Sequence, residues 1–112
     1  MPRAYPANCD PDQVAAELDR LWDEFSTQPR VEGSWAVLAR AARWTQSWQT
    51  RRAAQWSRLG VWARATDQPH AVWRAILAAE HHCVTTALRA EARAVRCERE
   101  AAEEATRARV VA

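Results

Sequence analysis

The chain has 112 residues, which is too few for two domains that each bury a core of their own, so we expect one domain spanning residues 1–112. Apolar residues make up 48% and charged residues 27% of the chain, a balance that excludes the disordered and fibrous classes. Only two glycines occur, which favours long helices over sheets with glycine-containing hairpins. The predicted fold class is all-α: a small helical bundle made of a long antiparallel helix hairpin and a shorter N-terminal helix.

Hydropathy and cysteine content indicate the compartment. The longest stretch without charge is far shorter than the ~20 residues that a membrane helix requires, and the first nine residues lack the apolar core of a signal peptide. The three cysteines, Cys9, Cys83 and Cys97, lack metal-ligand spacing and predict buried thiols without a disulfide. We therefore expect a cytoplasmic protein that does not contact membranes.

The first helix is expected at about residues 10–26, after an extended tail over residues 1–9. Asp10 and Pro11 form a cap followed by a first-turn proline, which is a strong start signal for a helix. Pro29 ends it, because proline disfavours helical geometry at the preceding residue. One apolar stripe recurs at helical spacing and consists of Val14, Leu18, Leu21, Trp22 and Phe25.

The second helix is expected at about residues 34–66, capped by Ser34 and able to bend near Gly60. Its predicted buried face consists of Val37, Ala41, Trp44, Trp48, Leu59 and Trp62. A helix-turn-helix that divides this segment near Thr50 is a weaker alternative, because no glycine or proline supplies the turn.

The third helix is expected at about residues 69–107, after the break that ends at Pro69. Its predicted buried stripe consists of Trp73, Ile76, Leu77, Val84, Ala87, Leu88, Ala94 and Val95. The short break predicts an antiparallel hairpin in which facing residue numbers sum to about 136. This register places Trp48 against Leu88 and Ala41 against Val95.

Glu80 lies within that stripe, where an unpaired carboxylate would be costly. We expect it to pair with Arg51 or Arg52.

Charge is distributed unevenly along the chain. Residues 34–66 contain six arginines and no acid, whereas residues 10–32 contain seven acids and two arginines. Four arginines of the second helix lie on one side of it and are candidate phosphate contacts, because guanidinium binds phosphate through two parallel hydrogen bonds: Arg40, Arg43, Arg51 and Arg58. The alternative is that the acidic first helix neutralises these arginines within the fold.

Tryptophan is unusually abundant, with seven residues in the chain. Trp35 lies on the opposite side of the second helix from Trp44, so aromatic side chains occupy both sides. Trp35 and Trp56 are candidate members of an interaction surface with a partner or a second copy. The alternative is that the first helix covers Trp35.

No motif indicates catalysis. The segment from Glu80 to Cys83 contains two histidines, but His81 and His82 point about 100° apart on a helix and cannot chelate one ion together. The sequence lacks a glycine-rich phosphate loop and a serine, histidine and aspartate arrangement. We expect a protein that is not an enzyme and that needs no metal and no cofactor.

The size, the helical bundle and the row of Arg40, Arg43, Arg51 and Arg58 resemble the small helical subunits of class 1 CRISPR effector complexes. In that family several copies line a ribonucleoprotein filament and contact guide or target nucleic acid. The resemblance implies a non-catalytic small subunit that binds RNA or single-stranded DNA together with other protein subunits, including copies of itself. The alternative is a helical protein–protein interaction module, such as an antitoxin or a phage-type assembly protein, without nucleic-acid contact.

Overall fold

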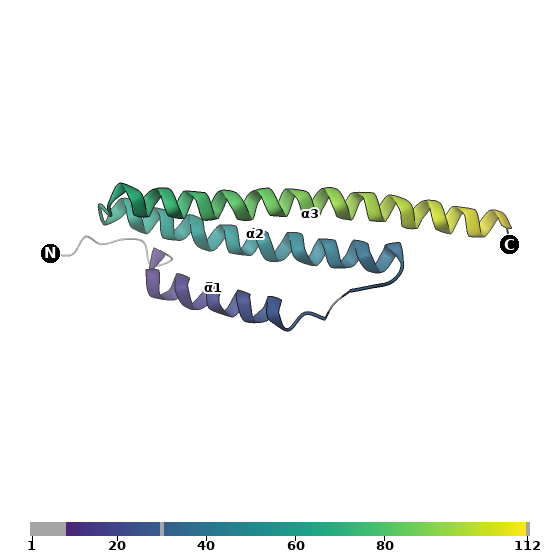
Figure 1. Ribbon diagram of the computed structural model, residues 1–112, viewed down its shortest axis with the longest axis horizontal. Coiled ribbons are helices and arrows are strands. Elements are labelled where there is room, and N and C mark those ends of the chain that lie inside the picture. Colours follow the sequence, from purple (N-terminus) through teal and green to yellow (C-terminus); the bar gives the residue numbers. More distant parts are fainter. Residues whose placement is uncertain (1–8, 30, 112) are drawn as a thin grey trace.

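The structure is a computed structural model that describes residues 9–29 and 31–111. This part of the chain forms three helices and no strand, which confirms the all-α fold. The helices lie side by side in an elongated molecule of 73 × 23 × 21 Å (Figure 1). The predicted extended tail lies outside the described residues except for Cys9, which is buried. No helix in the described ranges is long and apolar enough to cross a membrane.

The first helix, α1 (Pro11–Ser26), begins where the sequence predicts. The Asp10 side chain accepts a hydrogen bond of 2.9 Å from the backbone N–H of Asp12 and so satisfies one of the free donors of the first turn. Val14 and Leu21 are the buried residues of this helix. They pack against α2, and α1 makes no contact with α3.

The other two helices, α2 (Trp35–Ala65) and α3 (His70–Val111), form the predicted antiparallel hairpin. Ser34 caps α2, and Gly33 before it has a φ of 145°, a backbone conformation that side chains with a Cβ rarely adopt. The turn between the helices contains Asp67 with a φ of 51°. Residues after Ala101 are exposed, and α3 extends past the start of α2 (Figure 1).

Mostly small side chains form the seam between α2 and α3, and their spacing is that of a coiled coil. Buried and half-buried positions recur at alternate spacings of three and four residues, which keeps one stripe of each helix against the other. In α2 they are Ala39, Ala42, Gln46, Gln49, Ala53, Trp56, Gly60 and Ala63. In α3 they are Trp73, Ile76, Glu80, Cys83, Ala87, Ala90, Ala94 and Cys97.

The predicted register is right, and the predicted buried faces are right in part. Every residue of the predicted α2 face is buried or half-buried, whereas four residues of the predicted α3 stripe are exposed, namely Leu77, Val84, Leu88 and Val95. A Cβ on Gly60 would lie 3.6 Å from Ile76, as the predicted register requires. Trp48, however, packs against α1, and its predicted partner Leu88 is 60% exposed. The predicted stripes consist mainly of large apolar side chains, whereas ten of the sixteen seam positions are alanine, cysteine or glycine, which allow the two helices to approach closely.

Candidate interaction surface

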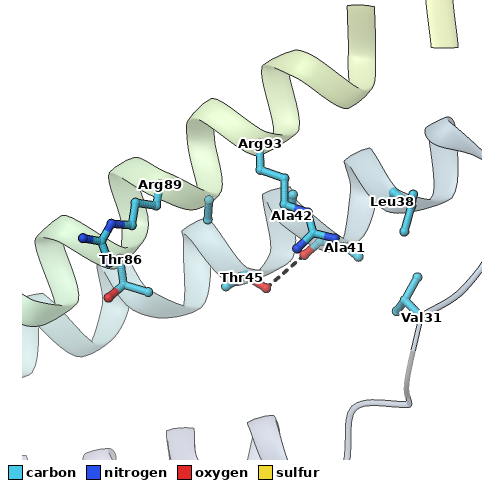
Figure 2. A pocket seen from close by; sticks show the side chains of 9 residues that line it. Val31, Leu38, Ala41, Ala42, Thr45, Thr86, Arg89 and Arg93 are labelled. Carbon is cyan, nitrogen blue, oxygen red and sulfur yellow. Dashed lines mark hydrogen bonds between the residues drawn. The ribbon is translucent and has the colours of Figure 1, made fainter. Parts of the chain in front are cut away.

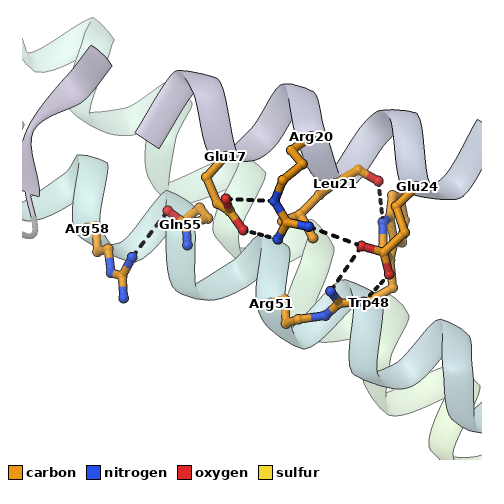
Figure 3. A network of polar contacts seen from close by, with 8 residues as sticks. All are labelled: Glu17, Arg20, Leu21, Glu24, Trp48, Arg51, Gln55 and Arg58. Carbon is orange, nitrogen blue, oxygen red and sulfur yellow. Dashed lines mark hydrogen bonds and ion pairs between the residues drawn. The ribbon is translucent and has the colours of Figure 1, made fainter. Parts of the chain in front are cut away.

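The predicted arginine row lies on α2 beside α1, and the structure assigns its members different neighbours. Arg51 donates two hydrogen bonds to the Glu24 carboxylate, at 2.6 and 3.1 Å (Figure 3). Hydrogen bonding from Arg51 lowers the pKa of that carboxyl. The expected pair between Glu80 and Arg51 or Arg52 is therefore wrong, because Arg51 points to α1, on the side of α2 away from Glu80.

Arg52 also has another neighbour. Its guanidinium carbon lies 4.8 Å from the centre of a Trp48 ring, in a cation–π arrangement, and one of its N–H groups donates to Gln49. Arg52 remains close enough to Cys83 to act on that thiol electrostatically.

Acidic side chains of α1 lie beside the row of arginines on α2. Glu17 forms an ion pair with Arg20, and hydrogen bonding from Arg20 lowers the pKa of the Glu17 carboxyl. Arg20 also reaches Glu24 at 3.7 Å, so carboxylates and guanidinium groups alternate along a chain that runs within α1 and ends at Arg51 of α2 (Figure 3). Arg58 lies near Glu17 and donates to the side chain of Gln55 at 3.5 Å. The acidic first helix therefore neutralises part of the basic row.

Arg43, in contrast, points toward α3 and not toward α1. It forms an ion pair of 2.7 Å with Glu98 of α3, and hydrogen bonding from Arg43 lowers the pKa of the Glu98 carboxyl. Arg40 is exposed and has no carboxylate within ion-pair distance among the described residues. Of the four predicted phosphate contacts, Arg40 and Arg58 thus remain outside ion pairs, and Arg43 and Arg51 do not.

The two predicted surface tryptophans differ. Trp35 is 40% exposed at the start of α2, and α1 ends well short of that end of α2 (Figure 1). Trp56 is half-buried within the seam, and its indole Nε1 is buried without a hydrogen-bond partner in the part of the chain described. Trp56 therefore cannot belong to an outer interaction surface, because its position in the hairpin register turns it toward α3.

A cluster of four aromatic rings joins α1 to α2. Phe25 lies 4.5 Å from Trp48, 5.7 Å from Trp22 and 6.3 Å from Trp44, measured between ring centres. Trp48 is buried and donates its indole N–H to the backbone carbonyl of Leu21 at 2.6 Å (Figure 3). Trp22 and Phe25, in contrast, are 56% and 42% exposed. The cluster therefore has one buried, hydrogen-bonded ring, Trp48, and an exposed face formed by Trp22 and Phe25.

A groove borders this open face. It has a volume of about 370 Å³ and is lined by Phe25 and Trp44 together with the segment that connects α1 and α2. We call Trp22, Phe25, Trp44 and this groove the aromatic surface. The sequence predicted these residues to lie on the buried stripes of the first and second helices, because they are apolar and recur at helical spacing. Helical spacing does not show that the short α1 leaves one edge of these two stripes uncovered.

A second groove lies between α2, α3 and the same connecting segment (Figure 2). Its lining is mostly small or apolar, but Arg89 and Arg93 of α3 reach into its rim (Figure 2). Neither arginine has a carboxylate partner in the residues that the structure covers. The sequence did not predict this pair of arginines, because the net charge of residues 67–112 is zero. Their spacing of four residues does place both side chains on one side of a helix.

The cysteines and histidines of α3 do not form a reactive group. Burial raises the pKa of the Cys83 thiol, which lies in the seam. His81 and His82 are exposed, and no group of three metal-ligating side chains occurs in residues 9–29 and 31–111. Cys83 therefore serves the packing of α3 against α2.

Comparison of the chain with protein-family models, with curated proteins and with solved structures finds no match. The function is therefore inferred from this chain's own geometry and charge.

Proposed function

We propose that this chain is a non-catalytic helical protein–protein interaction module. The observation that carries the proposal is the open aromatic surface: Trp22 and Phe25 are half-exposed while resting on the buried Trp48. Aromatic side chains fixed by a packed base and bordered by a groove are typical of the residues that dominate binding energy at protein interfaces. Their rigid stacking lowers the entropy that binding costs.

The charges support the same proposal. Arg51 and Arg43, two of the four arginines of the basic row, are engaged by Glu24 and Glu98 within the fold. The net charge of the whole chain is only +2, which gives little long-range attraction to nucleic acid. The expected partner is a protein segment with apolar side chains that enter the groove beside Trp44.

The test is crosslinking of a tagged chain in cells that encode it, followed by identification of the captured proteins. Trp22→Ser should remove the specific partner and leave the fold intact, since Trp22 is largely exposed. Trp35→Ser is the matched control, because it removes an exposed tryptophan at a distant position on α2. Capture of the same partner by Trp22→Ser would contradict the proposal, as would its loss in Trp35→Ser alone.

Nucleic-acid binding within a ribonucleoprotein assembly is the second candidate function. It is favoured by Arg40 and Arg58, which are exposed on one side of α2 and form no ion pair with any described residue. Aromatic faces beside such arginines also suit the stacking of unpaired bases. The resemblance to small subunits of class 1 CRISPR effector complexes rests on the sequence alone, and Arg40 and Arg58 belong to the row of four arginines that carries it.

Binding of a single-stranded oligonucleotide at several salt concentrations separates the two candidates. The second candidate expects binding that weakens steeply with salt, and each arginine removed should reduce the salt slope by about one unit. The comparison is wild type against Arg40→Glu with Arg58→Glu. Binding by wild type that the double variant loses would favour the nucleic-acid function, whereas no binding by wild type favours the protein-interaction module.

A further inference from the structure

The two grooves described above join across α2. The groove beside Phe25 and Trp44 has a volume of about 370 Å³, and the groove bordered by Arg89 and Arg93 has a volume of about 320 Å³. Three residues line both of them, namely Val31, Ala41 and Thr45. One ligand can therefore extend from the aromatic rings to the two arginines. We call the two grooves together the joint groove.

Arg89 and Arg93 are the free side-chain donors of the second groove. They are exposed, lie one helical turn apart on α3, and form no ion pair or hydrogen bond with any residue that the structure describes (Figure 2). The hydroxyl groups in the same lining are already engaged, because each donates to the backbone carbonyl four residues earlier, Thr45 at 3.1 Å and Thr86 at 2.6 Å. This groove therefore offers a ligand two guanidinium groups.

These two donors suit a pair of carboxylates. Guanidinium binds carboxylate through two parallel hydrogen bonds, and such charged pairs strengthen where apolar surroundings exclude water. The described residues that line the joint groove include no acid, so they supply no carboxylate there. Cβ atoms four residues apart on a helix are about 6 Å apart, which matches acidic residues one turn apart on a partner helix or alternate residues of a strand.

The other end of the joint groove repels anions. The helix α1 contains five acids and one arginine, and its last turn, including Ser26, borders the groove beside Phe25. Asp19 and Asp23 form no ion pair with the described residues, and the carbonyl groups at the end of a helix carry partial negative charge. The carboxylates of a ligand are therefore directed toward α3, and its uncharged side chains toward α1.

This division of charge favours a protein segment over a nucleic-acid strand. A strand carries a phosphate at every nucleotide, so bases stacked on the aromatic surface would bring phosphates close to the acids of α1. A protein segment can instead place carboxylates at one end and apolar side chains at the other. The remaining lining of the second groove is aliphatic and suits such side chains: Val31, Leu38, Ala41, Ala42 and Ala90.

We propose that the joint groove binds an acidic segment of a partner protein, whose apolar side chains contact Phe25 and Trp44 and whose carboxylates pair with Arg89 and Arg93. This assignment rests on the interaction function proposed above and adds the charge and the orientation of the partner segment.

Selection of peptides from a phage-displayed library of random sequences tests the assignment on the full chain. Peptides that wild type enriches should contain apolar residues together with more aspartate and glutamate than the starting library. Arg89→Gln with Arg93→Gln should enrich apolar peptides without this excess of acid, and Trp22→Ser should enrich neither kind. The matched control is Arg107→Gln with Arg109→Gln, which lowers the net charge equally at exposed positions about 21 Å or more beyond Arg93.

The affinity of one enriched acidic peptide, measured by fluorescence anisotropy, gives a second readout. Arg89→Gln with Arg93→Gln should weaken binding about tenfold or more, because it removes two charge-assisted contacts, and the matched control should stay within about twofold of wild type. Replacing the acids of the peptide by their amides should weaken binding to wild type by a similar factor and should hardly change binding to the arginine double variant. Circular dichroism establishes that all variants remain helical.

The possible failures are distinguishable. No enriched peptide, or equal enrichment by wild type and Trp22→Ser, would contradict the interaction function and this assignment with it. Peptides that depend on Trp22 but carry no excess of acid would overturn the role given to Arg89 and Arg93 alone, as would an acidic peptide that the arginine double variant binds as tightly as wild type. Binding of a single-stranded oligonucleotide that this variant loses would also overturn it, because the arginines would then contact phosphate.

Discussion

Trp48 shows how a single side chain fixes the position of α1. Its indole N–H donates to the Leu21 carbonyl, and its ring stacks on Phe25, so both a polar and an apolar contact cross from α2 to α1. The sequence predicted that Trp48 is buried but assigned it to α3. Helical periodicity gives the direction in which a residue points and not the neighbour that it meets there.

Trp48→Phe should lower the free energy of unfolding by about 1–3 kcal/mol, because it removes a buried hydrogen bond and part of the ring volume. Urea unfolding followed by circular dichroism measures the change. Trp22→Phe, at a largely exposed position, serves as the control and should stay within about 0.5 kcal/mol of wild type. Equal effects of the two substitutions would show that Trp48 does not hold α1.

The ion pairs of α1 predict a pH dependence of stability. The pKa values of Glu17 and Glu24 are lowered in the folded chain by hydrogen bonds from Arg20 and Arg51. A carboxyl with a lowered folded pKa stabilises the fold above its unfolded pKa, here about 4.5, and this stabilisation is lost as the pH falls further.

Glu24→Gln should therefore reduce the loss of stability between pH 5 and pH 3, measured by urea unfolding at each pH. Asp19→Asn removes a carboxylate that forms no ion pair with the residues that the structure describes, and it serves as the control. If Glu24→Gln loses stability with falling pH as steeply as wild type does, the pair with Arg51 contributes nothing to folding.

At the scale of the helices, the sequence predicted element order, cap positions and hairpin register, but only part of the packed faces. The breaks at residues 27–34 and 66–69 are set by proline, glycine and capping residues, whose effect is local and can be recognised without a structure. The seam depends on how closely two helices approach, which is a property of the pair. Small residues such as Ala53 and Ala90 contribute little to an apolar stripe, so helical periodicity alone does not identify them as seam residues.

The candidate site was predictable only in part. The basic row on α2 and the abundance of tryptophan were evident, but the pairing of Arg43 with Glu98 joins residues that are distant in sequence. Exposure of Trp22 and burial of Trp56 depend on where the short α1 ends and on the rotation of α2 against α3. Neither quantity is encoded in the pattern of one helix alone.

Gly60 provides a test of the seam. It lies within α2 with a helical backbone, and a Cβ there would meet Ile76 at an ordinary contact distance of 3.6 Å. Gly60→Ala should raise the free energy of unfolding by about 0.4–1 kcal/mol, because alanine loses less backbone entropy in a helix. Thermal unfolding monitored by circular dichroism measures this.

The paired control is Gly33→Ala, which makes the same chemical change where the backbone has a φ of 145°. It should destabilise the chain, since alanine is strained in that conformation. A loss of stability in Gly60→Ala would show that α2 and α3 approach more closely at this point than the structure describes.

At the scale of the whole molecule, the three helices form a rod of 73 Å in which α1 lies beside only part of α2 (Figure 1). The aromatic surface lies where α1 meets α2, and the Trp48 hydrogen bond and the ion pair between Glu24 and Arg51 join the two helices there. The aromatic surface therefore depends on the docking of α1 against α2.

Capture of partner proteins by the tagged chain tests the role of the aromatic surface most directly. Wild type and Trp35→Ser should capture the same protein, and Trp22→Ser should not, because Trp22 lies on the aromatic surface and Trp35 lies at the start of α2 away from it. Capture of that protein by Trp22→Ser at the level of wild type would contradict the account.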